Sequence, residues 1–236
     1  FLETLSTTMS HSELIHSNSS PTQLPSLEQI RLMPRFKNLD HQNILLIQNI
    51  EECLKIQAEL KMIAVLGFDT ESKPTFIKGE VCTGPHLIQL ASCEKAYLFQ
   101  VSEEILNFLK PIFENRDQIK VGFGLKNDAH LFRKKGIQLN SVIELSKCFS
   151  SYGLDNPVGL KNAMALLFQI NFPKNKKIST SNWSKKNLSP EQISYAAADA
   201  YAPVLIFEEL LKLGLLPQTI PNTSLKLRIR PSHSNG

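Results

Sequence analysis

Residues 62–70 form an almost continuous apolar run, and this run constrains the fold more than any other segment. A half-exposed strand alternates apolar and polar residues, whereas an uninterrupted run of this length is typical of a strand buried on both faces. Such a strand needs a covering layer on each side of its sheet. Two acidic residues, Asp69 and Glu71, stand at the end of the run. The sequence therefore predicts a central strand with carboxylates at one end.

Other segments supply the rest of an α/β domain. Short apolar runs predict further strands at residues 43–47, 87–91, 96–99 and 120–124. Apolar residues at helical spacing predict helices at residues 51–60, 103–113, 125–135, 159–169 and 190–213. The last of these helices has a clear start signal. Ser189 can cap it, Pro190 suits the first helical position, and Gln192 completes a capping box. Beyond residue 141 the pattern is mostly helical, so we predict a mixed β-sheet flanked by helices.

The chain of 236 residues has no internal repeat and no Pro/Gly-rich break in its middle, which favours one domain. Residues 1–28 are rich in Ser, Thr, Asn and His and predict a flexible tail. The predicted catalytic domain spans residues 29–217, and residues 218–236 are predicted as a C-terminal tail. The first residue is Phe and no secretory signal is visible, so we expect a fragment or a processed form.

Composition excludes several classes of protein. No apolar run approaches the roughly 18 residues that a membrane helix requires. The four cysteines include no CxxC pair, which argues against a zinc knuckle and a disulfide framework. Reduced thiols in an intracellular protein, most simply a cytoplasmic one, are the expectation.

Four acidic residues in three segments carry the functional signal: Asp69, Glu71, Asp128 and Asp199, with Tyr195 four residues before the last. Carboxylates in apolar segments are costly to bury unless a positive group neutralises them, and hard divalent cations commonly do so. Asp69 and Glu71 share one face of a strand, and Tyr195 and Asp199 share one face of a helix. Each residue alone also has a structural explanation, such as a helix cap or a surface ion pair. Together they predict a site for two metal ions.

Two divalent ions about 4 Å apart can bridge one phosphate, and oxygen ligands favour magnesium or manganese. Tyr195, with an ordinary pKa of about 10, is a poor base at neutral pH but can orient an attacking water. Residues 156–190 contain no acidic residue but six lysines, which suit a polyanionic substrate; a solvated lysine-rich loop is an equal alternative. These lysines are Lys161, Lys174, Lys176, Lys177, Lys185 and Lys186.

Three ordered motifs surround these acids, and the resemblance that they carry extends over roughly residues 43–213. The first is Gly67-Phe68-Asp69-Thr70-Glu71 with residues 85–91; the second is residues 121–128; the third is residues 159–162, 181–184, 188–192 and 195–200. The set resembles the DEDD 3′-to-5′ exonucleases with the tyrosine variant of the third motif. Within that family it is similar to the branch of ribonuclease D and the Werner syndrome exonuclease domain.

The resemblance implies a ribonuclease-H-like fold and hydrolysis of the 3′-terminal phosphodiester of DNA or RNA, with release of nucleoside 5′-monophosphates. It implies that Asp69, Glu71 and Asp199 hold one Mg²⁺ or Mn²⁺ ion and that Asp69 and Asp128 hold a second. Glu71 would also approach the terminal 3′ hydroxyl. The implied partner is a nucleic acid with a free 3′ end, not a membrane. A nucleic-acid-binding module without catalytic activity is the alternative, and the presence of all four acids and Tyr195 argues against it.

Further residues are candidates for substrate contact: Thr70, Phe76, Asn127 and Lys186. Many relatives have Arg-Pro-Leu where this chain has Lys186-Asn187-Leu188, so positive charge is kept but bidentate phosphate contact is not. Trp183 could stack on a base or be buried against the last helix, and burial is the expectation. Residues 122–124, Gly-Phe-Gly, match a dinucleotide-binding loop only weakly, because Asn127 stands at the third glycine position.

Overall fold

The computed structural model describes residues 23–75, 79 and 83–216. The strands are β1 (Ile44–Ile47), β2 (Val65–Glu71), β3 (Leu87–Ala91), β4 (Ala96–Gln100), β5 (Ile119–Gly122) and β6 (Val142–Glu144). The α-helices are α1 (Leu27–Leu32), α2 (Ile50–Met62), α3 (Glu103–Glu114), α4 (Lys126–Lys134), α5 (Leu160–Phe168), α6 (Lys176–Ser179) and α7 (Pro190–Lys212). Short 3₁₀ helices lie at His41–Asn43, Leu145–Lys147 and Ser150–Tyr152.

The strands form one mixed sheet in the order β1-β4-β3-β2-β5-β6. β2, the strand predicted from the apolar run, lies inside the sheet, antiparallel to β3 and parallel to β5. β3 and β4 form an antiparallel hairpin, while β1 pairs with β4 and β6 with β5 in parallel. The prediction of a mixed sheet is confirmed.

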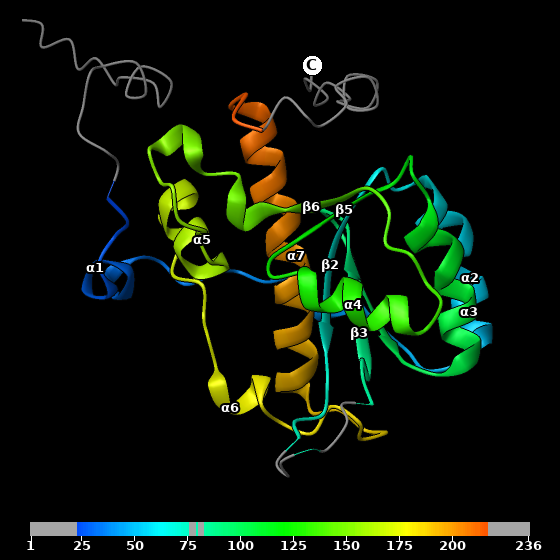
Figure 1. Cartoon of the computed structure of the whole chain (residues 1–236). Helices are drawn as coiled ribbons and strands as arrows, with labels where there is room; N and C mark the ends of the chain where they lie inside the picture. Colours follow the sequence, from blue (N-terminus) through cyan, green and yellow to red (C-terminus); the bar gives the residue numbers. More distant parts are fainter. Residues whose placement is uncertain (1–22, 76–78, 80–82, 217–236) are drawn as a thin grey trace, which may run out of the picture.

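Helices cover both faces of the sheet, as Figure 1 shows. On one face, α2 and α3 enclose a core in which the rings of Phe68, Phe113 and Phe132 meet at 4.9–6.0 Å between centroids. On the other face, α7 runs across β2, β3, β4 and β5, and α5 packs beside it. This double cover explains why residues 62–70 are apolar without alternation.

Small residues let α7 lie close to the sheet. At Gly67 in β2, an added Cβ atom would stand 1.8 Å from the carbonyl oxygen of Ala200 and 2.7 Å from Cγ2 of Val204. The α7 face presents Ala196, Ala197 and Ala200 to the sheet, all fully buried. The backbone of α7 therefore approaches β2 directly.

The start of α7 follows the predicted capping box. The Ser189 hydroxyl oxygen accepts a hydrogen bond from the Gln192 amide at 3.2 Å, and the Gln192 side chain accepts one from the Ser189 amide at 3.0 Å. These bonds satisfy backbone donors that a helix start otherwise leaves unpaired. The first turn of α7 is thus fixed by local sequence.

Three features differ from the sequence-based expectation. The tail boundary predicted at residue 28 falls inside α1, because a capping box between Ser26 and Gln29 and the burial of Ile30 start a helix at Leu27. The mostly helical pattern predicted beyond residue 141 missed β6, whose three half-buried residues are too few to show a strand period. The short helix α6 also lies in a segment without apolar periodicity.

The described residues include no helix that is both long and apolar enough to cross a membrane. Cys53, Cys93 and Cys148 are free thiols, in line with the expectation from cysteine spacing; Cys82 lies outside the described residues.

Candidate active site

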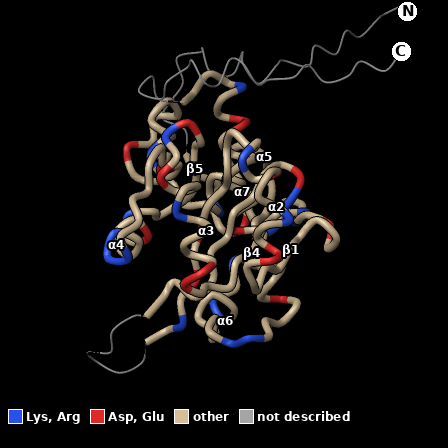
Figure 2. The backbone as a smooth tube through the Cα atoms, turned by 90° about the vertical axis from the view of Figure 1, so that its right-hand side faces the viewer, with Lys and Arg blue, Asp and Glu red and all other residues tan. Residues whose placement is uncertain are grey.

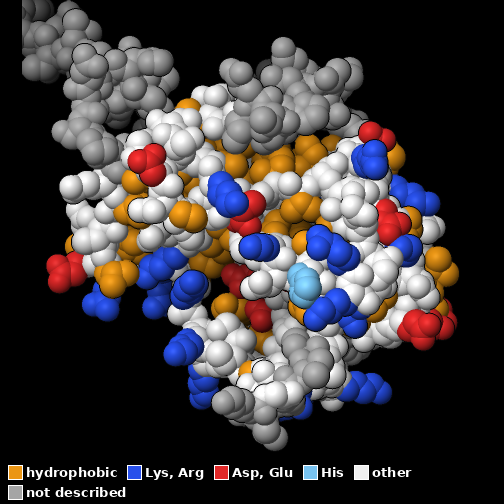
Figure 3. All heavy atoms as spheres, in the orientation of Figure 1, with side chains coloured by type: hydrophobic (Ala, Val, Ile, Leu, Met, Phe, Trp, Pro, Cys, Tyr) orange, Lys and Arg blue, Asp and Glu red, His pale blue; other side chains and the backbone are white. Residues whose placement is uncertain are grey.

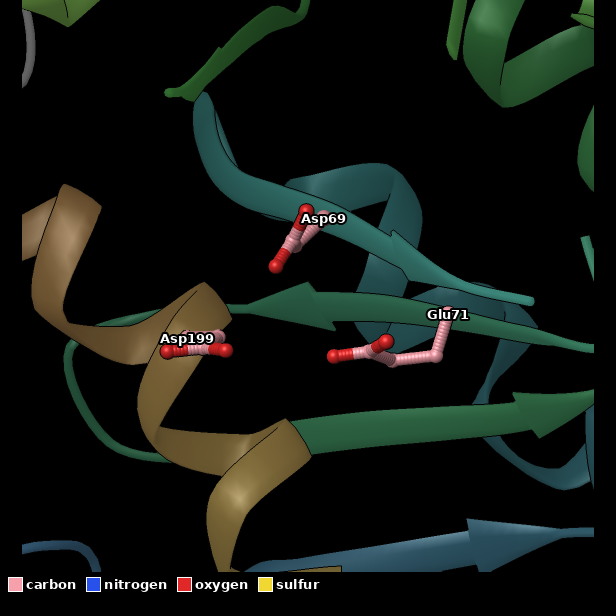
Figure 4. Close-up of side chains that lie close together, drawn as sticks. All are labelled: Asp69, Glu71 and Asp199. Carbon is pink, nitrogen blue, oxygen red and sulfur yellow. The ribbon is translucent and has the colours of Figure 1, made fainter. Parts of the chain in front are cut away.

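Three of the predicted acids meet where the end of β2 faces the middle of α7. One carboxylate oxygen from each of Asp69, Glu71 and Asp199 lies within 4.8 Å of the others. Figure 4 shows Asp69 and Glu71 on one side of β2, turned toward Asp199 on α7. The strand's two-residue period and the close approach at Gly67 produce this convergence.

Burial and mutual repulsion keep these carboxyls from ionising readily. Burial, reinforced by the charges of Asp199, Glu71 and Asp128, holds the pKa of Asp69 well above its ordinary value. Burial and the charges of Asp199 and Asp128 raise the pKa of Glu71 to about 8. Burial raises the pKa of Asp199 to about 7, although the nearby Lys174 ammonium acts in the opposite direction. A divalent cation bound among these carboxyls would offset both effects, so metal binding at the cluster would compete with protons.

Asp128, the fourth predicted acid, lies beside this cluster rather than within it. It is the third residue of α4, and its Oδ1 accepts a hydrogen bond from the hydroxyl of Thr70 in β2. Thr70, predicted as a substrate contact, thus joins the strand of the first motif to the helix of the second. Burial raises the pKa of Asp128, and the hydrogen bond from Thr70 opposes this rise.

Tyr195 stands one turn before Asp199 on α7, and its hydroxyl is hydrogen-bonded to the Asp199 carboxylate. Burial, followed by the charges of Asp199 and Glu71, raises the pKa of Tyr195 above its ordinary value. The phenol therefore stays protonated and can act as a hydrogen-bond donor. Trp183 packs behind Tyr195, with ring centroids 6.2 Å apart. It is 1% exposed and donates to the Ser179 carbonyl, so it is a buried support and not a base-stacking platform.

Basic side chains border the site on two sides. Figure 3 shows acidic side chains in a hollow with Lys and Arg around it, and Figure 2 shows Lys and Arg on α4 and α6. On α4, Lys126, His130, Arg133 and Lys134 are exposed at helical spacing, and Asn127 is exposed next to Asp128. The exposed Lys186 contributes its carbonyl to hydrogen bonds from Gln48 and Gln100. Phe76 lies outside the described residues.

Glu144, at the end of β6, is a residue that sequence reasoning missed. Its carboxylate accepts hydrogen bonds from the amides of Gly124 at 3.1 Å and Leu125 at 2.9 Å, and from Ser146. The glycine-containing loop before α4 therefore binds a carboxylate of this chain instead of a dinucleotide phosphate. Glu144 is identifiable only once β6 is known to pair with β5, because the two segments lie apart in sequence.

We expect Glu144→Gln to loosen the start of α4 and so to misplace Asp128. The variant loses the charge-assisted character of two loop hydrogen bonds, which predicts a loss of about 1–2 kcal/mol in unfolding free energy. Urea unfolding measures this loss, and hydrogen exchange should accelerate at the Gly124 and Leu125 amides. Glu103→Gln, at an exposed acid in the first turn of α3, is the control. Unchanged exchange at both amides would contradict the positioning role.

The donor set suits a hard divalent cation. All three converging ligands are carboxylates, which are ligands of magnesium and manganese, and positive charge at the cluster would relieve the repulsion that raises their pKa values. Gln89 lies opposite Asp69 in the sheet and is fully buried, yet its side-chain nitrogen and oxygen have no hydrogen-bond partner among the described residues. An unpaired buried amide is costly, so a bound water or ligand oxygen beside Asp69 would stabilise it.

Comparison with known proteins places this site in a family. Residues 44–214 match the family model described as 3′-5′ exonuclease. The chain is 35% identical over 161 residues to the bifunctional 3′-5′ exonuclease/ATP-dependent helicase WRN of Mus musculus, a match over 64% of this chain and 11% of that protein. Curated relatives are longer: the chain spans 11%, 54% and 31% of three of them.

Solved structures share the fold. The EXO domain of Aedes aegypti Nibbler superposes with a TM-score of 0.65 at 23% identity, covering 79% of this chain and 97% of that one. Escherichia coli RNase D superposes with a TM-score of 0.61 at 20% identity, covering 78% of this chain and 49% of that one. The mixed sheet with helices on both faces is thus ribonuclease-H-like, as predicted. With its matched domain, the chain belongs to the DEDD 3′-5′ exonuclease family, and its sequence is similar to that of WRN.

Proposed function

We propose that this chain is a divalent-metal-dependent 3′-to-5′ exonuclease that hydrolyses the 3′-terminal phosphodiester of DNA or RNA and releases nucleoside 5′-monophosphates. The observation that carries the proposal is the convergence of Asp69, Glu71 and Asp199 within 4.8 Å in a site bordered by basic side chains. Residues 29–217 form the proposed catalytic domain, and the family match over residues 44–214 supports that assignment. We also propose a location inside the cell, which the free thiols support.

Two Mg²⁺ or Mn²⁺ ions, when bound, would supply charge stabilisation on both sides of the reacting phosphate. Asp69, Glu71 and Asp199 would hold one ion, and Asp69 with Asp128 the other. Tyr195 would orient the attacking water by accepting a hydrogen bond from it at the hydroxyl oxygen. Its own proton, which the phenol retains because its pKa is raised, stays in the hydrogen bond to Asp199. Glu71, at the end of β2, would accept a hydrogen bond from the terminal 3′ hydroxyl and thereby restrict attack to chain ends.

Tyr195→Phe tests the proposal and the role of the phenol together. We expect the variant to lose about a hundredfold in kcat, because the water loses its orienting partner while the carboxylates remain. The measurement is release of mononucleotides from a 3′-labelled linear oligonucleotide in magnesium or manganese. The thermal shift that either ion produces should persist. Tyr201→Phe, at a half-buried tyrosine on the same helix that is not part of the carboxylate cluster, is the matched control.

Several outcomes distinguish the alternatives. A wild-type rate for Tyr195→Phe would remove the phenol from the mechanism. Cleavage of a circular single strand would indicate an endonuclease, since a circle offers no 3′ end. Binding of the linear strand without any hydrolysis in either ion would favour the catalytically inactive module. Matched DNA and RNA substrates decide the preferred nucleic acid.

A further inference from the structure

A cavity of about 440 Å³ opens beside the N-terminal half of α7, and Tyr195 and Asp199 form part of its wall. The lining is largely apolar and includes Phe36, Phe172 and Ile178. The volume falls within the range of about 300–1,000 Å³ that small-ligand sites occupy. The cavity thus shares Tyr195 and Asp199 with the candidate active site, while Asp69 and Glu71 are not part of its lining.

Part of this wall comes from residues 33–40, here called the strap, which precede the family match at residue 44. The strap is fixed to the domain by backbone hydrogen bonds: Phe36 donates to the Asn171 carbonyl at 3.0 Å, and Asn171 donates to the Pro34 carbonyl at 2.8 Å. The side chain of Asn38 donates to the Ser194 carbonyl on α7 at 2.8 Å. The strap therefore adds a wall to the site that the matched domain does not itself include.

The aromatic groups of this wall are held in place before any ligand binds. The Phe36 ring packs against Phe172 at 5.0 Å and Tyr201 at 6.0 Å between centroids. Two asparagines also line the cavity. Asn38 uses both of its amide atoms on backbone groups, and Oδ1 of Asn175 accepts hydrogen bonds from the Lys177 and Ile178 amides. A cavity with a fixed aromatic and apolar surface suits the flat face of a nucleobase better than a sequence-specific edge.

Positive charge lies at the same cavity. Lys174 stands between two lining residues, Pro173 and Asn175, and acts electrostatically on Asp199. Lys176 and Lys177 are exposed at the start of α6 directly after them. Lysines around an aromatic cavity match a strand whose bases enter the cavity while its phosphates stay at the rim.

We propose that this cavity holds one nucleobase of the substrate strand, from one of the two nucleotides joined by the bond to be cleaved, and that Phe36 of the strap is a binding residue for it. This inference deepens the proposed exonuclease function and rests on it for the identity of the ligand. It implies that the protein requires a base at that position but tolerates any of the four bases.

The test is equilibrium binding of 5′-labelled oligonucleotides in chelator, measured by fluorescence anisotropy. The strands carry either a normal base or an abasic residue at the first, second or third nucleotide from the 3′ end. We expect about tenfold weaker binding when the abasic residue is at the first or the second position, and no change at the third. Equal binding of all four strands would overturn the proposal, as would an equal loss at every position.

Substitutions at the strap then assign the effect. Phe36→Leu should abolish most of the tenfold discrimination, whereas Phe36→Tyr should retain it, because only the latter keeps an aromatic face. Phe168→Leu, at a half-buried phenylalanine on α5 outside the lining, is the control. If Phe36→Leu fails to fold, Glu191→Trp fills the cavity from the exposed first turn of α7 and should have the same effect. Undiminished discrimination in the folded variants overturns the assignment.

Binding in chelator separates this inference from the proposed function. Base-dependent binding by a protein that never hydrolyses the strand would support the cavity and contradict the exonuclease proposal. Hydrolysis of the 3′ end without any base dependence would do the reverse.

Discussion

Asp69→Asn is expected to lose at least about a thousandfold in hydrolysis and, at the same time, to unfold at a higher temperature than the wild-type protein when both are free of metal. The lost rate corresponds to about 4 kcal/mol of transition-state stabilisation. The gain in stability has a separate cause, because Asp69 is a buried carboxyl that repels Glu71, Asp199 and Asp128. An amide of the same shape removes that repulsion.

The stability difference between Asp69→Asn and the wild-type protein should depend on pH. The pKa of Glu71, about 8, and that of Asp199, about 7, lie above the unfolded values of about 4.3 and 3.9. Between these limits the unfolded chain binds fewer protons than the folded one, so these groups lower stability as pH rises from about 4 to about 8. In the wild-type protein the raised pKa of Asp69 adds a further loss of stability of the same sign, which the amide of Asp69→Asn cannot incur. The Tm advantage of Asp69→Asn should therefore grow between pH 5 and pH 8 in calorimetry.

Metal ions should reverse the order of stability. A ligand that binds only the folded state stabilises it, by about 2.7 kcal/mol at a hundred times its Kd. Manganese or magnesium should thus raise the Tm of the wild-type protein and leave that of Asp69→Asn nearly unchanged. Asp155→Asn, at an exposed aspartate, is the control and should respond to metal as the wild-type protein does. A metal-free Asp69→Asn protein less stable than wild type at pH 8 would contradict the repulsion argument.

Gly67→Ala is the second change with a large expected effect. The new Cβ would lie 1.8 Å from the Ala200 carbonyl oxygen, which belongs to helix backbone and cannot rotate away. The helix α7 must then move from β2, and overpacking of this kind costs about 3 kcal/mol of unfolding free energy. Because α7 carries Asp199 and Tyr195, a shift of even 1 Å predicts about a hundredfold loss of hydrolysis.

Urea unfolding and the nuclease rate measure both consequences of Gly67→Ala. Gly159→Ala is the matched control, since a Cβ at that position meets nothing within 4 Å. Gly159 is a helix N-cap, so its replacement should cost at most about 1 kcal/mol and leave the rate unchanged. If Gly67→Ala matched Gly159→Ala in both unfolding free energy and nuclease rate, the close approach of α7 to β2 would not be what determines the geometry of the site.

Local sequence was sufficient for the parts of the fold that depend on short-range physics. The apolar run ending at Asp69 predicted the central strand, and the capping box at Ser189 predicted the start of α7 to the residue. The pairing of Asp69 with Glu71 on one face followed from the strand period, and the structure confirms it. These features require no knowledge of which segments meet.

Features made by contacts between distant segments were not predictable in this way. Glu144 acquires its role only because β6 lies beside β5, and the strap forms a wall only because Phe36 meets Asn171. Asp128 lies outside the three-carboxylate cluster and accepts a hydrogen bond from Thr70, a contact that no spacing rule encodes. Packing decides each of these outcomes, and packing is a property of the whole domain.

The position of α7 also has a consequence for synthesis of the protein. Chains emerge from the ribosome N-terminus first, and α7 follows all six strands in the sequence. Until α7 docks, Asp69 and Glu71 lack Asp199 and Tyr195, and the sheet face that α7 covers is open to solvent. A nascent chain therefore cannot complete the candidate site until the last helix has been synthesised and has docked on the sheet.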